Sequence, residues 1–138
     1  MPEPTSAAKT VFVSISFAHR EARRAELDAI EAACAAAGLR AHIFVRAYTF
    51  APDDQRAMMD RTQSDLRVAG LLIAEVSHKA IGVGIEIGFA KALGIPVIYL
   101  RHETAAPSTT VGGIADHALV YANADDLRAR LAEVLVNK

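Results

Sequence analysis

The chain has 138 residues, of which 52% are hydrophobic and 22% charged, and its formal net charge is −1. These values are typical of a single soluble globular domain and exclude a disordered chain. No apolar run approaches the roughly 20 residues that span a bilayer, so we expect no membrane partner. The charges are spread along the sequence, which argues against binding of a polymeric nucleic acid, because such binding needs concentrated positive charge.

The beginning of the chain lacks a basic segment followed by an apolar one, so we expect no signal peptide. We predict that residues 1–10 form a flexible tail and that residues 11–138 form a single domain. The one cysteine, Cys34, excludes an internal disulfide and is expected to be a small buried side chain. These features together favour the cytoplasm as the compartment.

Apolar stretches alternate with amphipathic ones along the rest of the chain. β-Branched and other apolar residues predict strands at residues 11–17, 41–45, 69–76, 95–100 and 118–121. Apolar residues at helical spacing, or helix start signals, predict helices at residues 20–37, 53–67, 84–93 and after residue 123. Residues 101–113 are rich in Pro, Ser, Thr and Gly and are predicted to form a mobile loop.

This alternation predicts an α/β fold, a doubly wound five-stranded parallel sheet of flavodoxin-like (Rossmann-like) order with helices on both faces. Ligands of such sheets bind at the carboxyl ends of the strands, near the point where the strand order reverses. The loops after the first and third strands flank that point. They carry Ser14, Ser16, His19, Arg20, Glu75, Ser77, His78, Gly82, Gly84 and Glu86.

The segment Gly82-Val83-Gly84-Ile85-Glu86-Ile87-Gly88 carries the strongest functional signal. It predicts a glycine turn that leads from the third strand into a helix, with Glu86 on the first turn of that helix. The dinucleotide fingerprint differs, since it has Gly-x-Gly-x-x-Gly after the first strand. A glutamate at this helix start would also repel a pyrophosphate. We therefore expect no NAD or FAD cofactor, and no other.

A glutamate in this place can attack the anomeric carbon at a glycosidic bond and form a glycosyl-enzyme that water or another acceptor resolves. The helix N-terminus would help to keep Glu86 ionised. A second acid should protonate the leaving group, and Asp60, Asp65 and Glu75 are the carboxylates nearby in sequence. Alternatively, Glu86 only stabilises the helix start, and spacing alone leaves both interpretations open.

Residues 74–90, followed by Leu93-Gly94-Ile95-Pro96-Val97, resemble the nucleoside 2-deoxyribosyltransferase family, and especially its deoxynucleoside 5′-monophosphate N-glycosidase branch. The resemblance implies that Glu86 is the nucleophile at C1′ of the sugar. It also implies a homodimer or higher homo-oligomer, in which a serine from a neighbouring subunit's late loop completes the pocket. The substrate-binding residues expected for a nucleoside or nucleotide are Phe12, Ser14, Ser16, Ser77, His78, Gly82, Gly84 and Ser108.

The chain departs from the pattern of that branch at three positions. Ile15 stands in place of the glycine of a Gly-Ser step, and Ala80 stands in place of a phosphate-binding serine. The catalytic aspartate of the preceding helix falls near Thr62, with Asp60 and Asp65 offset from it. The nucleophile therefore carries over, whereas the phosphate site and the general acid do not.

The opening strand, the helix after it and a later glutamate are also similar to TIR domains, some of which cleave the nicotinamide N-glycosidic bond of NAD. We therefore expect an N-glycosidase that cleaves a base–sugar bond through a covalent glycosyl-Glu86 intermediate. A deoxyribosyltransferase, a TIR-like NAD glycohydrolase and a non-catalytic nucleotide-sensing module remain as alternatives. No metal site is expected, because His42, His102 and His117 lack companions at metal-ligand spacing.

Overall fold

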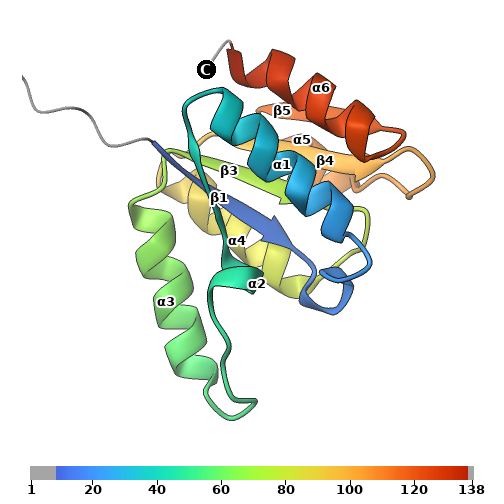
Figure 1. Cartoon of the computed structure of the whole chain (residues 1–138). Coiled ribbons are helices and arrows are strands. Elements are labelled where there is room, and N and C mark those ends of the chain that lie inside the picture. Colours follow the sequence, from blue (N-terminus) through green and yellow to red (C-terminus); the bar gives the residue numbers. More distant parts are fainter. Residues whose placement is uncertain (1–8, 137–138) are drawn as a thin grey trace, which may run out of the picture.

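A computed structural model describes residues 9–136 of the chain (Figure 1). The strands are β1 (Thr10–Ile15), β2 (Arg40–Ile43), β3 (Leu71–Glu75), β4 (Val97–His102) and β5 (His117–Tyr121). All pairings between neighbours are parallel, and the sheet order is β2-β1-β3-β4-β5. This order confirms the predicted flavodoxin-like α/β fold, and it reverses between β1 and β3.

Helices cover both faces of the sheet. They are η1 (Phe17–His19), α1 (Arg24–Ala36), α2 (Phe44–Ala47), α3 (Gln55–Arg67), α4 (Ile81–Ala92), α5 (Thr109–Ile114) and α6 (Ala124–Val136). Helices α1 and α6 lie side by side on one face, whereas α3 and α4 lie on the other (Figure 1). None of the described helices is both long and apolar enough to cross a bilayer.

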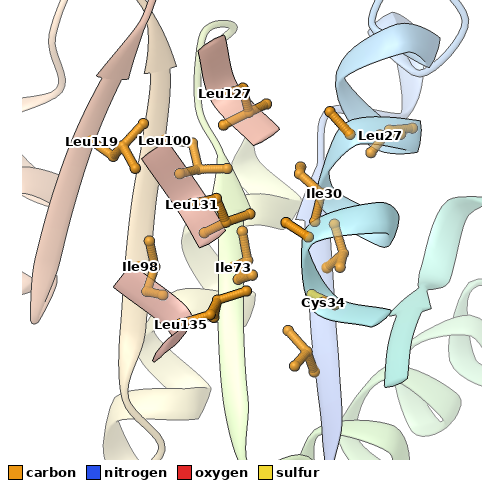
Figure 2. Close-up of a cluster of buried hydrophobic side chains, with 14 of the residues drawn as sticks. Leu27, Ile30, Cys34, Ile73, Ile98, Leu100, Leu119, Leu127, Leu131 and Leu135 are labelled. Atoms are coloured by element: carbon orange, nitrogen blue, oxygen red, sulfur yellow. The ribbon is translucent and has the colours of Figure 1, made fainter. Parts of the chain in front are cut away.

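The alternation of side chains along β1 divides the core into two clusters. Val11, Val13 and Ile15 pack with α1 and α6, whereas Phe12 packs with α3 and α4. Figure 2 shows the first cluster, in which leucines of α6 and apolar residues of α1 point toward Ile73 on the sheet. Because both faces are covered, consecutive residues along β1 and β3 are buried, and most of them are apolar.

The element boundaries predicted from the sequence differ from the structure at the start of β1 and at the start of α1. Of the predicted flexible tail, residues 1–10, the first eight lie outside the described residues. Residue 10 does not belong to a tail, because β1 begins at Thr10. The helix predicted from residue 20 begins at Arg24, because η1 precedes it. It ends as predicted before Gly38, whose φ of +77° favours glycine.

Three later predictions also need correction. The second strand ends at Ile43, because the next four residues form α2. The predicted loop over residues 101–113 holds the end of β4 and the start of α5, which Ser108 caps by accepting a hydrogen bond from the amide of Val111 at 3.1 Å. Gly82 and Gly84 lie inside α4 rather than in a turn, and neither has a positive φ.

Leu131→Ala should lower the free energy of unfolding by about 2–5 kcal/mol, because it leaves a cavity between α6 and the sheet. The side chain of Leu131 is fully buried. Val136, in the same helix, is 77% exposed, and Val136→Ala is the matched control. Urea denaturation measures both variants. Similar losses in the two would contradict the placement of α6 on the core.

Candidate active site

Glu86 contacts the carboxyl end of β1 through Ser14. The hydroxyl of Ser14, which is buried, donates a hydrogen bond to Oε1 of Glu86. Ser14 faces the α3 and α4 side of the sheet, because it follows Phe12 by two residues along the strand. The contact therefore lies beside the point where the strand order reverses, and it brings two of the sequence-predicted site residues together.

Desolvation dominates the electrostatics of Glu86. Burial raises the pKa of Glu86 to about 7, and the hydrogen bond from Ser14 opposes this rise. Helix α4 starts at Ile81 and has no acidic residue in its first turn, so the prediction that Glu86 sits on the first turn is wrong. Near neutral pH the carboxyl group exists in both forms, and the donor from Ser14 favours the ionised, nucleophilic one.

A pair of stacked imidazoles lies in the loops that follow β1 and β3. The hydroxyl of Ser16 lies 2.8 Å from Nδ1 of His19, in a hydrogen bond. The rings of His19 and His78 stack with centroids 3.6 Å apart and an interplanar angle of 3°. Arg23 donates through Nε to Nε2 of His78 at 3.4 Å. Ser16 and His78 are thus brought together as predicted site residues, with His19 between them.

The charge on this imidazole pair is limited by its surroundings. Burial lowers the pKa of His78, and the neighbouring His19 and Arg23 lower it further. Two imidazoles in face-to-face contact repel each other when both are protonated. These causes disfavour the protonated form of His78, and only the charge of Glu75 opposes them. His19 was absent from the predicted substrate-binding set, although its place in the loop after β1 was a signal for it.

Glu75 lies on the other face of the sheet, the one that α1 and α6 cover, and both of its carboxylate oxygens accept hydrogen bonds. It is 1% exposed, and its Oε1 accepts the backbone N–H of Ser77 at 2.8 Å. Its Oε2 accepts the hydroxyl of Ser77 at 2.6 Å and that of Tyr121 at 2.5 Å. The hydroxyl of Ser77 also accepts the N–H of His102 at 2.8 Å. Glu75 and Ser77 therefore join the ends of three strands, and Ser77 has no free hydroxyl for the predicted substrate contact.

The predicted acid Asp65 belongs to a different network. Its carboxylate is hydrogen-bonded to Nε2 of His42 at 2.7 Å and to the hydroxyl of Tyr48 at 2.9 Å. It also pairs with Nε of Arg61 at 3.2 Å, one helical turn earlier. These contacts attach α3 to β2 and to the loop after α2. The structure brings Asp65 to these partners and shows no contact between Asp65 and Glu86 among the described residues.

The other predicted acid, Asp60, is exposed on α3 and has no hydrogen bond or ion pair with the described residues. Thr62, near which the family aspartate would fall, is 2% exposed. Its hydroxyl donates to the carbonyl of Met58 at 2.9 Å, within the same helix. Neither residue brings a carboxyl group to Glu86, so α3 supplies no acid to the site in this structure.

Phe12 lies in the core instead of in a substrate pocket. It is fully buried, stacks on Phe44 at a centroid distance of 5.7 Å and meets His42 edge-on. Its prediction as a substrate contact is therefore corrected to a packing role.

Gly84 and Ser108 line a cleft between the starts of α4 and α5, with a volume of about 360 Å³. The lining is mostly apolar and includes Ile81 and Lys79. Gly82 lies beside this cleft, exposed on the first turn of α4. A Cβ added at either glycine would have no neighbouring atom within 4 Å, so no other side chain covers these two positions. The cleft does not include Glu86.

The site offers acid–base groups rather than metal ligands. Across residues 9–136, no three His, Cys, Asp or Glu side chains converge as they would around a metal ion. The carboxyl ends of β1 and β3 and the segments that follow them carry one half-buried carboxyl group, two hydroxyls, two imidazoles and a guanidinium group. Such a set can supply a nucleophile, a proton and hydrogen bonds to a polar ligand.

Comparisons with known proteins give one local match in sequence and several matches in fold. No family model matches the chain. A 37-residue segment is 54% identical to the "Putative 2′-deoxynucleoside 5′-phosphate N-hydrolase 1" of Syntrophotalea carbinolica. This match covers 27% of the chain and 26% of that protein, so it spans about a quarter of the relative.

Two solved structures share the fold. A CMP N-glycosidase of Clostridium botulinum superposes with a TM-score of 0.68 and 20% identity, over 91% of this chain and 99% of that one. A 2-deoxyribosyltransferase of Bacillus psychrosaccharolyticus gives a TM-score of 0.66 and 11% identity, over 88% and 95%. At these identities the likeness is one of fold. The resemblance to the nucleoside 2-deoxyribosyltransferase family is thus confirmed, locally in sequence and across the chain in fold.

Glu86→Gln should remove a pH dependence of stability. The pKa of Glu86 is about 7 in the folded chain against an ordinary 4.5, so folding takes up a proton between these values. Glu86 therefore lowers the free energy of unfolding of the wild type as the pH rises from about 4.5 to 7. Above pH 7 this loss of stability stays constant. We expect the variant to gain on the order of 2 kcal/mol over wild type between pH 5 and pH 8, after discounting for partial exposure.

Urea denaturation across this pH range measures the difference between the two proteins. Ser14→Ala provides the complementary variant, because removal of the donor should raise the pKa of Glu86 further and move the transition to higher pH. Ser64→Ala, on the exposed side of α3, is the control. Parallel stability curves for wild type and Glu86→Gln would show that Glu86 is not desolvated.

Proposed function

We propose that the chain belongs to the nucleoside 2-deoxyribosyltransferase family and is an N-glycosidase. It cleaves the base–sugar bond of a nucleoside or nucleoside monophosphate, with Glu86 as the nucleophile. The observation that carries this proposal is the hydrogen bond from Ser14 to Glu86, which fixes the motif glutamate at the carboxyl end of β1. The names of the relatives described above support the same reaction class.

The ionised carboxylate of Glu86 attacks C1′ of the sugar and forms a glycosyl ester, while the electrons of the C1′–N bond pass to the base. The base takes up a proton and leaves. Water then attacks C1′, breaks the ester and returns the carboxylate of Glu86. Ser14 holds one oxygen of Glu86, which leaves the other oxygen as the attacking atom. The raised pKa of Glu86 keeps the carboxylate basic enough to form the ester.

Hydrolysis is favoured over transfer, because the sequence offers no feature for a second nucleoside. The other readings differ in what they require of Glu86. A deoxyribosyltransferase and a TIR-like NAD glycohydrolase use the same glutamate with another acceptor or another substrate. A nucleotide-sensing module would bind without turnover and would not need the carboxylate. The absence of a family aspartate at Thr62 and of a phosphate-binding serine at Ala80 motivates that last reading.

Incubation with a panel of nucleosides, nucleoside monophosphates and NAD, followed by chromatography of the released base, tests the proposal. Glu86→Gln should reduce release by about 10³-fold or more, because the amide cannot form the ester. Glu31→Gln, exposed on α1, is the matched control and should retain activity.

Equal background release by wild type and Glu86→Gln over the whole panel would reject the enzymatic reading. Calorimetric binding of a nucleotide by both proteins, without turnover, would then support the sensing module. Release of nicotinamide alone would select the NAD glycohydrolase. Base exchange in the presence of a second base, faster than hydrolysis, would select the transferase.

We also propose that the protein is a homodimer or a higher homo-oligomer. Large apolar side chains are exposed on α4, where Ile81 is 86% and Ile85 is 51% exposed. They flank the cleft that Ser108 lines, so a second copy seated there would cover them and would approach the candidate site. The free, buried thiol of Cys34 is compatible with the cytoplasm proposed from the sequence.

Sedimentation velocity at micromolar concentration tests the oligomer. Wild type should sediment as a dimer or larger species, and Ile81→Glu should shift it toward monomer, because a charge is introduced into an apolar contact. Val68→Glu is the control, since Val68 is 76% exposed at the end of α3. A wild-type protein that is monomeric at every concentration would contradict the proposal.

A further inference from the structure

The side chains of Ser14 and Glu86 form an exclusive pair. The hydroxyl of Ser14 is 2% exposed and donates to Oε1 of Glu86. Across residues 9–136, neither side chain has another hydrogen bond or an ion pair. In the register of the sheet Ser14 lies beside Ala74 of β3, whose side chain has no polar atom. The hydroxyl has one hydrogen to donate, and Glu86 receives it, so none is left for a substrate.

Helix α4 offers no charged group of its own to Glu86. None of the residues one turn away on either side has a polar side chain; they are Gly82, Val83, Phe89 and Ala90. Burial raises the pKa of Glu86, and among the described groups only the hydrogen bond from Ser14 opposes this rise. Within the described chain, Ser14 is thus the group that stabilises negative charge on Glu86.

The negative charge on Glu86 changes twice during the proposed reaction. In the first step Oε2 bonds to C1′, the electron pair of the C1′–N bond passes to the base, and the base takes a proton from water. The carboxylate becomes a neutral ester, so the hydrogen bond to Oε1 weakens. In the second step water attacks C1′ and loses a proton to solvent, while the electron pair of the C1′–Oε2 bond returns to the carboxylate. The same hydrogen bond then strengthens.

This change in strength makes the two steps unequal. A group accelerates a step only if it binds the transition state more strongly than the state before it. The donor from Ser14 meets that condition in the second step, where charge returns to Glu86, and not in the first step, where charge is lost. Burial makes the donor more important, because a carboxylate with a raised pKa attacks well but leaves C1′ slowly.

We infer that Ser14 is a positioning residue for the second half of the reaction, in which it holds the carbonyl oxygen of the glycosyl ester and stabilises the carboxylate of Glu86 as it leaves C1′. The inference rests on the proposed N-glycosidase function. It assigns Ser14 to the nucleophile, in place of the substrate contact expected from the sequence. Ser14 therefore determines how long the ester lasts rather than how fast it forms.

Ser14→Ala should make breakdown of the ester the slow step. The substrate is the member of the nucleoside, nucleoside monophosphate and NAD panel that wild type cleaves fastest, at about pH 9, where Glu86 is ionised. Loss of a hydrogen bond to a charged oxygen should lower kcat about 10–100-fold and leave kcat/KM within about threefold of wild type. Mass spectrometry of acid-quenched Ser14→Ala should show the added mass of the sugar, and peptide mapping should place it on Glu86.

Methanol gives a second measurement, because it attacks C1′ in place of water. It should raise kcat of Ser14→Ala by a larger factor than that of wild type, an effect that a merely structural role would not produce. Ser14→Cys keeps a similar volume with a weak donor. It should show the same split between kcat and kcat/KM at a smaller size, and it carries the test if Ser14→Ala does not fold.

Thr10→Ala is the matched control, because it removes a hydroxyl from the other end of β1. There Oγ1 of Thr10 accepts a hydrogen bond from Arg40 at 2.9 Å. This variant should keep the kcat of wild type and should carry no sugar. Circular dichroism checks that each variant is folded.

The outcomes separate the inference from the function on which it rests. Equal losses in kcat and kcat/KM, without sugar on the protein, would overturn the role of Ser14, while loss of base release in Glu86→Gln would still support the glycosidase. A wild-type kcat in Ser14→Ala would overturn it as well. An increase in KM alone would make Ser14 a substrate contact and overturn the inference. Base release that is insensitive to Glu86→Gln, or none from any member of the panel, would reject the proposed function itself.

Discussion

The candidate site depends on one hydrogen bond between two groups that would each be unfavourable alone. The hydroxyl of Ser14 is buried, and a buried hydroxyl without a partner destabilises the folded state. The carboxyl group of Glu86 is half-buried, and its ionised form needs a donor. Each group satisfies the other across 72 positions of sequence. This bond fixes how α4 lies against β1, and it places the carboxyl group at the ligand-binding edge of the sheet.

The carboxyl groups of Glu75 and Glu86 differ in their hydrogen bonding and in their exposure to solvent. Glu75 accepts hydrogen bonds from a backbone amide and two hydroxyls, and is closed off from solvent. Glu86 has one donor and remains partly exposed. A carboxylate with donors on both oxygens stabilises the ends of strands, whereas one with a single donor keeps an oxygen for chemistry. The two glutamates thus differ both in their number of donors and in their burial.

Most of the fold could be predicted from local patterns, and most of the site could not. Each strand is an apolar run of its own, so the alternation predicted the sheet and its order. The start of α4 was misplaced, because Gly82 and Gly84 signal a turn in sequence but adopt ordinary helical backbone here. The contacts of Asp65 could not be predicted, because its partners His42 and Tyr48 come from a strand and a loop that precede it by 17 residues or more.

The proximity of Ser14 and Glu86 could be predicted from the sequence, because the first and third strands are neighbours in a sheet of this order. The imidazole pair was not. Stacking of His19 on His78 depends on the conformation of two separate loops, and no spacing rule predicts it. Nor does a single sequence reveal that Ser16 and Arg23 engage one nitrogen on each ring.

The departure of this chain from the family pattern at Thr62 has an electrostatic consequence for Glu86. A threonine at the position of an acid indicates, by itself, loss of catalysis. A carboxylic acid beside a carboxylate nucleophile also has a physical disadvantage, because the two groups compete for one negative charge. Burial already raises the pKa of Glu86 to about 7, and a second carboxylate nearby would raise this pKa further. The threonine therefore avoids a further rise in the pKa of the desolvated glutamate that this chain retains.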